Sequence, residues 1–183
     1  AMVAADLLAQ AEHDPEALPV LVTTSQVLAS AVEAELDDQL ADLPTREVAL
    51  AALENGFVTV APDMDTAIGV CDRLAPEHLQ VMTMNPGEVA SRLRNWGGLF
   101  VGAGSAEVLG DYGAGPNHTL PTGGVARYRG GLSVMDFIRV RTWLEIGDAG
   151  AARETIEDSI ALARIEGLEA HARAAERRLK PGR

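Results

Sequence analysis

Short apolar segments alternate with amphipathic segments over residues 3–102, and this alternation constrains the fold more than any other feature. The apolar segments are rich in β-branched residues, as buried strands are, and they cover residues 19–25, 57–61, 78–83 and 98–102. The segments between them have the apolar spacing of helices and cover residues 3–14, 26–43, 45–55, 64–75 and 87–95. Ser25, a residue type that favours helix N-termini, marks the start of the second helix. We therefore predict an α/β fold.

Strands that alternate with helices of about ten residues indicate parallel βαβ units with helices on both faces. We expect residues 3–131 to form a Rossmann-like half-domain, that is, a partial doubly wound parallel sheet. From Gly102 to about Gly131 the alternation gives way to a glycine-rich loop. Residues 132–183 are expected to form a C-terminal helical arm outside the α/β layers. Within it, residues 132–146 fit a strand or a helix, and residues 151–179 are helical with a break near Gly167.

Composition excludes several classes of partner. The formal net charge of −12 argues against nucleic acid or an anionic membrane, because binding phosphates requires clustered Lys and Arg. Apolar residues make up 47% and charged residues 23%, as in an ordinary soluble domain, and no apolar run approaches the length of a membrane span. The single cysteine, Cys71, cannot form an internal disulfide, which favours a reducing, cytoplasmic compartment.

The stretch "GDYGAGPNH", residues 110–118, places Asp111 and His118 in a run of Gly, Pro and Asn. Such a run cannot hold a helix or a long strand, because Gly costs backbone entropy and Pro removes a hydrogen-bond donor. The segment is therefore expected to be a shaped loop, and shaped loops frequently bind ligands. The alternative is a surface connection in which both side chains face water.

Two further pairs of side chains could carry chemistry. Gln10 and His13 are three residues apart on the first helix, so they emerge on one face and could bind a metal ion. The alternative is a solvated helix end. Glu77 and His78 lie side by side where a helix gives way to a strand, and imidazole beside carboxylate supplies a general base near neutral pH. Here the alternative is a polar loop.

The four histidines share one feature. Each has a Gln, Asp or Glu within seven residues, and His171 follows Glu166 by five. Imidazole and oxygen ligands in such a mixture suit Zn²⁺ or a similar divalent ion. Taken singly, His171 fits an exposed position among charged neighbours better than a ligand position.

One segment invites a dinucleotide-binding interpretation. "GLFVGAGSAE" follows a predicted strand and contains Gly102 and Gly104. The third small position is occupied by Glu107, however, and no helical pattern follows directly. We therefore do not expect a dinucleotide fingerprint there.

Five segments, taken in order, resemble the successive motifs of histidinol dehydrogenase: "LLAQAEHDP", "APEHLQ", "GDYGAGPNHTLPTGG", "GLSVMDFIRVRTW" and "EGLEAHARA". This family comprises zinc enzymes that oxidise L-histidinol to L-histidine with two molecules of NAD⁺, in histidine biosynthesis. The resemblance implies four zinc ligands, which also line the substrate pocket: Gln10, His13, Asp111 and His171. It further implies that Glu77 and His78 form the acid/base pair, and that His78, His118 and Glu166 contact the substrate.

The resemblance also implies a homodimer in which the ligand His171 comes from the neighbouring subunit, so that the C-terminal arm is exchanged. Family members are more than twice as long, and the part with most of the NAD-binding domain precedes Val3. The chain is thus expected to be a fragment, or a natural half that works with a separate N-terminal partner, or a remnant. The alternative functions are a non-catalytic zinc-binding dimer and a related dehydrogenase of another small polar alcohol.

Overall fold

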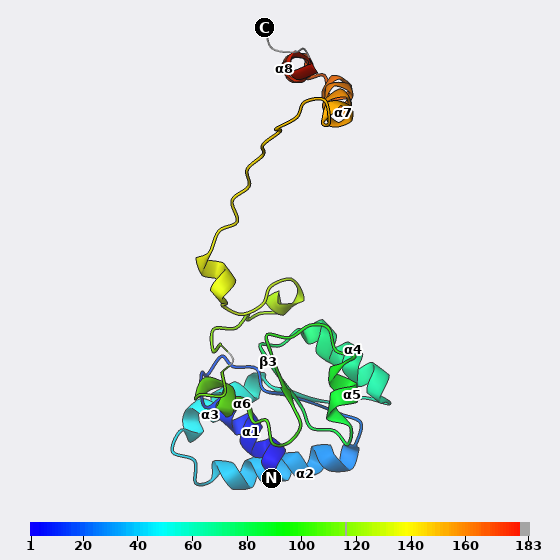
Figure 1. Ribbon diagram of the computed structural model, residues 1–183. Helices are drawn as coiled ribbons and strands as arrows, with labels where there is room; N and C mark the ends of the chain where they lie inside the picture. The colour runs from blue at the N-terminus through cyan, green and yellow to red at the C-terminus, as the bar shows by residue number, and fades with distance from the viewer. Residues whose placement is uncertain (116, 180–183) are drawn as a thin grey trace. The chain divides into compact units, whose positions relative to one another are not determined.

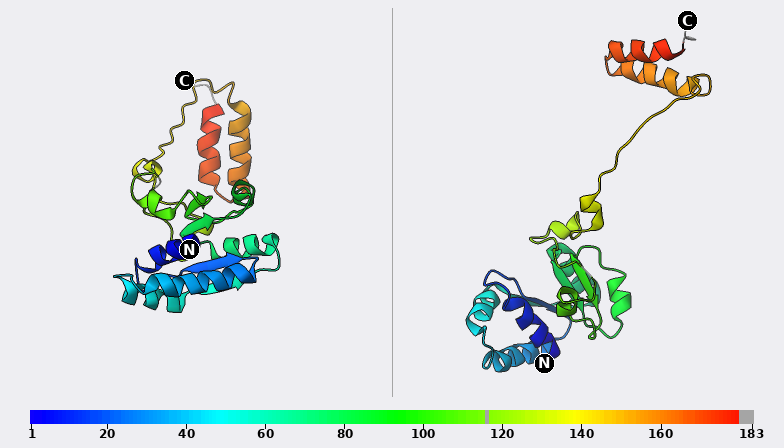
Figure 2. Two further views of the ribbon diagram at one scale, coloured as in Figure 1. Left: turned by 90° about the horizontal axis from the view of Figure 1, so that it is seen from below. Right: turned by 60° about the vertical axis from the view of Figure 1, so that its left-hand side comes forward.

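The computed structural model describes residues 1–115 and 117–179 (Figures 1 and 2). The chain divides into two units, Ala1–Ile138 and a second that begins at Arg139. Pro116 of the predicted loop and residues 180–183 of the predicted arm lie outside the described residues. Within the described residues, no helix is both long and apolar enough to cross a membrane.

The first unit contains the predicted alternation of strands and helices. Its strands are β1 (Val20–Thr23), β2 (Phe57–Val60), β3 (His78–Val81) and β4 (Gly98–Val101). Its helices are α1 (Met2–Ala11), α2 (Gln26–Leu40), α3 (Arg46–Asn55), α4 (Met64–Leu74), α5 (Pro86–Ala90) and α6 (Glu107–Asp111). Two 3₁₀ turns, η1 (Val125–Arg127) and η2 (Val134–Phe137), follow them. The order of elements confirms the α/β prediction.

Side-chain caps set several of these boundaries. Ser25 Oγ accepts a hydrogen bond from the Leu28 amide at the start of α2, as predicted, and Asp63 Oδ1 accepts one from the Thr66 amide at the start of α4. Helix α4 ends at Ala75, which adopts the left-handed conformation with φ 48°. That reversal turns the chain through Pro76 into β3.

The four strands pair in parallel but not into one sheet. Strand β1 pairs with β2, and β3 pairs with β4, giving two two-stranded sheets. The prediction of parallel strands is confirmed, whereas the single doubly wound sheet is not formed by the described strands. The physical reason is that each helical layer buries its own apolar cluster: Leu8 and Leu40 lie among α1, α2 and α3, while Ile68 and Val81 lie between α4 and β3.

The predicted glycine-rich loop contains regular structure that the sequence does not suggest. Helix α6 occupies Glu107–Asp111, where we expected no helix. It is held by tertiary contact, since Gly110 lies so close to the Phe100 ring of β4 that an added Cβ would be 2.9 Å from Cε1. The ambiguous stretch 132–146 is neither a long strand nor a long helix: the short turn η2 is followed by backbone without regular structure.

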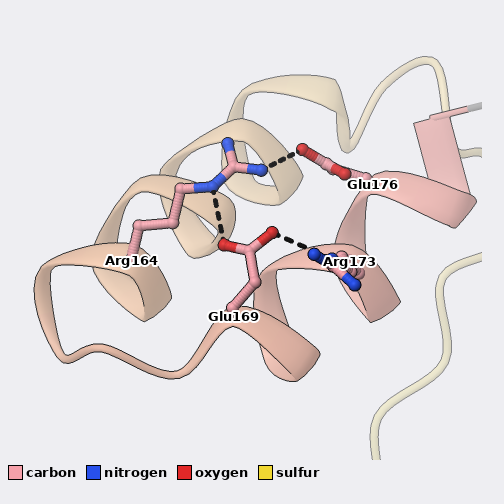
Figure 3. Close-up of polar contacts among 4 residues, drawn as sticks. All are labelled: Arg164, Glu169, Arg173 and Glu176. Carbon is pink, nitrogen blue, oxygen red and sulfur yellow. Dashed lines mark hydrogen bonds and ion pairs between the residues drawn. The ribbon is translucent and has the colours of Figure 1, made fainter.

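The second unit contains two helices, α7 (Arg153–Ile165) and α8 (Glu169–Leu179), which lie side by side in both views of Figure 2. The predicted break is confirmed at Gly167, whose φ of 76° ends α7. Ile156, Ile160 and Ala172 form the apolar contact between the helices. Figure 3 shows the polar link at their junction, where Arg164 contacts Glu169 and Glu176, and Arg173 contacts Glu169.

Candidate active site

Five of the predicted site residues come together in the first unit near Glu107, a residue that was not among the predicted ones. Gln10 lies on the last turn of α1, and His13 follows it. His78 begins β3, while Glu107 and Asp111 begin and end α6. His118 lies in the loop beyond α6. Because β3 and β4 are paired and α6 packs on β4, the fold brings α1, β3 and α6 to one place (Figure 1).

Glu107 is the most buried charged residue of this group, with 8% of its surface exposed. Gln10 Nε2 donates a hydrogen bond to Glu107 Oε2, and His78 Nε2 lies 3.3 Å from Glu107 Oε1. Burial raises the pKa of Glu107, and the neighbouring Asp111 carboxylate adds to this, while His78, Gln10 and His13 act in the opposite direction. The carboxyl group is therefore enclosed but has a partner on each oxygen.

Asp111 and His118 form a second contact at the edge of the cluster. His118 Nδ1 lies 3.0 Å from Asp111 Oδ1; the Asp111 side chain is 17% exposed and that of His118 64%. The hydrogen bond with Asp111 raises the pKa of His118, and the charges of Asp111, Glu77 and Glu107 also favour the imidazolium. The His13 ring lies 6.5 Å from the His118 ring, centroid to centroid. His13 thus belongs to the same cluster although its side chain is exposed.

His78 has an apolar wall as well as a polar partner. Its ring centroid lies 6.0 Å from that of Phe100, which is buried in β4. Glu77 precedes His78 and is partly buried, and its backbone carbonyl accepts the Gly98 amide at 2.7 Å. The predicted acid/base pair is therefore anchored to the first rung of the β3–β4 sheet. It lies at the amino end of β3, whereas open α/β sheets usually place sites at the carboxyl ends of strands.

Glu166 and His171 belong to the second unit. Glu166 is the C-cap residue of α7, and His171 is exposed on α8. Their predicted roles in substrate and zinc binding stay predictions.

The cluster has the donor chemistry of a metal site. One ligand atom each from His78, Glu107 and Asp111 lie within 4.8 Å of one another. Gln10 and His13 add an amide oxygen and an imidazole nitrogen, and mixed nitrogen and oxygen donors suit zinc. Since Gln10 uses Nε2 toward Glu107, its oxygen is the atom left for a cation. Of the predicted ligands, Asp111 belongs to this trio, Gln10 contacts Glu107 of the trio, and the His13 ring lies near that of His118. Their role as zinc ligands stays a prediction.

Glu107 is the residue that sequence reasoning missed as part of the site. In the sequence, Glu107 stands out only as the residue that breaks a dinucleotide fingerprint. The available signal was that it is the one carboxylate between Gly98 and Gly110, in a segment otherwise made of small and apolar residues. A lone charge in such a segment is expected to be paired when the segment packs.

Comparisons with known proteins agree with the motifs. The family model for histidinol dehydrogenase matches residues 1–179. Histidinol dehydrogenase of Nitratidesulfovibrio vulgaris is 53% identical over 96% of this chain and 40% of its own length. Histidinol dehydrogenase of Geobacillus kaustophilus is 49% identical over 98% of this chain and 42% of its own length. The crystal structure of histidinol dehydrogenase from Elizabethkingia anophelis matches with a TM-score of 0.91 and 33% identity, over 97% of this chain and 41% of that one.

The chain therefore spans about two fifths of the length of these curated relatives. The family model that matches residues 1–179 and the identity to these relatives show that the chain belongs to the histidinol dehydrogenase family.

Proposed function

We propose that this chain provides the zinc-binding and acid/base residues of an enzyme that oxidises L-histidinol, through L-histidinal, to L-histidine with NAD⁺. The observation that carries the proposal is the cluster in which Gln10, His78 and Asp111 surround the buried Glu107. A site of this composition is unusual for a structural core, because buried carboxylates are retained mainly where they bind, orient or transfer protons.

Each residue has a role that follows from its chemistry. Gln10, His13 and Asp111 would hold zinc, with His171 from a second copy of the chain completing the set. When bound, zinc supplies a Lewis acid that orients the amine and imidazole nitrogens of the substrate. His78 takes the proton of the substrate hydroxyl as the alcohol carbon is oxidised.

The second oxidation requires water. Glu77 helps His78 remove a proton from the water that attacks the aldehyde carbon, so that the hydrate can be oxidised to the acid. His118 and Glu166 contact the substrate in this proposal. The exposed imidazole of His118, held by Asp111, is placed for such a contact at the rim of the cluster.

The residues of this chain do not fit a dinucleotide at its one candidate loop. Glu107 follows Gly102 and Gly104 and directs its carboxylate to Gln10 and His78. A carboxylate there would repel a pyrophosphate group, and α6 is too short to bind one at its N-terminus. We therefore assign the NAD site to the remaining length of the enzyme, which would also extend the two short sheets into larger ones. The homodimer with exchanged arms and the cytoplasmic location are part of this proposal.

The test is NADH formation from L-histidinol. The chain is produced together with the N-terminal remainder of the Nitratidesulfovibrio vulgaris relative and loaded with zinc. We expect activity that Asp111→Asn abolishes, while Asp37→Asn, at an exposed position on α2, leaves it unchanged. A folded, zinc-loaded assembly that forms no NADH from L-histidinol would contradict the proposal. Oxidation of another small alcohol in preference would reassign the substrate.

A further inference from the structure

Glu107 connects two residues that have different tasks in the proposed function. One carboxylate oxygen accepts the Gln10 amide from α1, and the other lies 3.3 Å from His78 Nε2 on β3. Gln10 and Glu107 are 97 residues apart in the sequence, so this is a tertiary link and not a local cap. Glu107 itself is 8% exposed, so its two contacts are partly shielded from competing water.

We propose that Glu107 is a positioning residue that fixes the amide orientation of Gln10 and the tautomer of His78. The proposal rests on the proposed function above. It assigns to Glu107 no contact with the substrate and no coordination of zinc.

The orientation of Gln10 follows from the inventory of donors and acceptors. An ionised carboxylate only accepts hydrogen bonds, so the amide end that faces Glu107 must be the NH₂ group. The Gln10 carbonyl oxygen then points elsewhere, and it is the only Gln10 atom that can bind a cation. With a neutral amide at position 107, either end of Gln10 could face it, and half of the orientations would present the wrong atom.

The tautomer of His78 follows from the same reasoning. A neutral imidazole that faces a carboxylate with Nε2 carries its proton on Nε2, which leaves Nδ1 as the free base. Phe100 packs near the ring and limits its rotation. A general base must present its unprotonated nitrogen to the substrate, so the wrong tautomer removes the base without removing the residue.

The first measurement is zinc affinity of the 183-residue chain, by competition with a chromophoric chelator. Outer contacts of metal ligands are typically worth about 10–100-fold in affinity. We expect Glu107→Gln to weaken zinc binding by about tenfold or more, and Glu88→Gln, at an exposed glutamate on α5, to have no effect. Circular dichroism checks that each variant is folded, and Glu107→Met, of similar length, replaces Glu107→Gln if the latter is not.

A double variant separates positioning from direct coordination. If Glu107 acts through Gln10, the variant Gln10→Ala/Glu107→Gln binds zinc no more weakly than Gln10→Ala alone, because the two changes remove one interaction. If Glu107 coordinates zinc itself, the double variant loses zinc affinity by the product of the two single-variant factors. Multiplied losses would overturn the proposal.

The second measurement does not depend on zinc. Ring ¹⁵N shifts of His78 in the metal-free chain, at a pH where the imidazole is neutral, should show the Nε2–H tautomer. Glu107→Gln should produce a mixture of tautomers. A His78 tautomer that is unchanged by this substitution would overturn the proposal even if zinc binding fell. Failure of the unaltered chain to bind zinc would count against the proposed function instead, and the tautomer measurement would still decide the role of Glu107.

Discussion

His118 Nδ1 lies 3.0 Å from Asp111 Oδ1, a contact that joins the glycine-rich loop to the end of α6. Asp111 is mostly enclosed, whereas His118 is largely exposed. The carboxylate therefore determines how the exposed imidazole is held and charged. This pair gives the loop a fixed end next to the buried part of the site.

The first prediction concerns the charge of His118. In the metal-free chain, Asp111→Asn should lower the pKa of His118, because it removes the charged acceptor that stabilises the imidazolium. A folded-state pKa above the ordinary value of 6.5 stabilises the fold below that value, and this contribution is lost as pH rises through the raised pKa. Titration of the His118 ring protons by NMR measures the shift, with Asp37→Asn as the control. An unchanged titration would show that the contact does not form in solution.

The second prediction concerns His78 in the assembled enzyme. His78→Asn should lower turnover by about 10²–10⁴-fold, the usual worth of a general base, while zinc content stays the same. Asparagine keeps a polar side chain near Glu107 but cannot take a proton. Steady-state kinetics with L-histidinol and elemental analysis of the same preparation test both parts. Loss of zinc together with activity would instead place His78 among the metal ligands.

The third prediction concerns the backbone beneath the acid/base pair. A Cβ on Gly97 would lie 2.5 Å from the Glu77 carbonyl oxygen and 3.0 Å from Pro121 Cδ. Gly97→Ala should therefore lower the free energy of unfolding by about 1–3 kcal/mol, as overpacking does, and displace Glu77. Gly69→Ala is the matched control, because nothing lies within 4 Å of its added Cβ and it is within α4, where Ala is favoured by about 0.5–1 kcal/mol. Urea unfolding should move the two variants in opposite directions.

Local sequence signals account for the elements of the fold but not for their assembly. The caps at Ser25 and Asp63 and the break at Gly167 depend on neighbouring residues, so they can be read from the sequence. The separation of β2 from β3 depends on which apolar clusters the helices form, and no local pattern encodes that. Helix α6 is stabilised against Phe100 of β4, and its sequence alone, with Gly110 inside it, does not favour a helix.

The site, like the fold, has a part that the sequence predicts and a part that it does not. Gln10, His78, Asp111 and His118 are recognisable because their residue types and spacing carry chemistry. Glu107 becomes part of the site only through tertiary contact with Gln10 and His78, and the residues next to it in the sequence do not indicate those partners. The identity of a buried carboxylate's partners is a property of the packed fold.

The fourth prediction concerns pH and the second unit. Hydrogen bonds from Arg164 and Arg173, at 3.3 and 3.0 Å, lower the pKa of Glu169 (Figure 3). A lowered carboxyl pKa stabilises the helix pair above the ordinary value of 4.5, and this contribution is lost as pH falls through the lowered pKa. Arg164→Gln should raise the pKa of Glu169, measured by carboxyl ¹³C NMR. Arg153→Gln, which breaks only the contact with Glu157 in α7, should leave it unchanged.

The fifth prediction is that the 183-residue chain by itself does not oxidise L-histidinol, although it carries every residue assigned above. Hydride transfer requires the nicotinamide to be held against the substrate carbon, and the rate gained from such placement depends on a formed cofactor pocket. The one glycine pair after a strand, Gly102 and Gly104, leads to Glu107, whose carboxylate is committed to Gln10 and His78. NADH absorbance, followed with the zinc-loaded chain and with the same chain combined with the N-terminal remainder of a relative, measures the difference. Turnover by the chain alone at the rate of the combined protein would mean that these residues form a nicotinamide site that neither the glycine pattern nor the packing of α6 indicates.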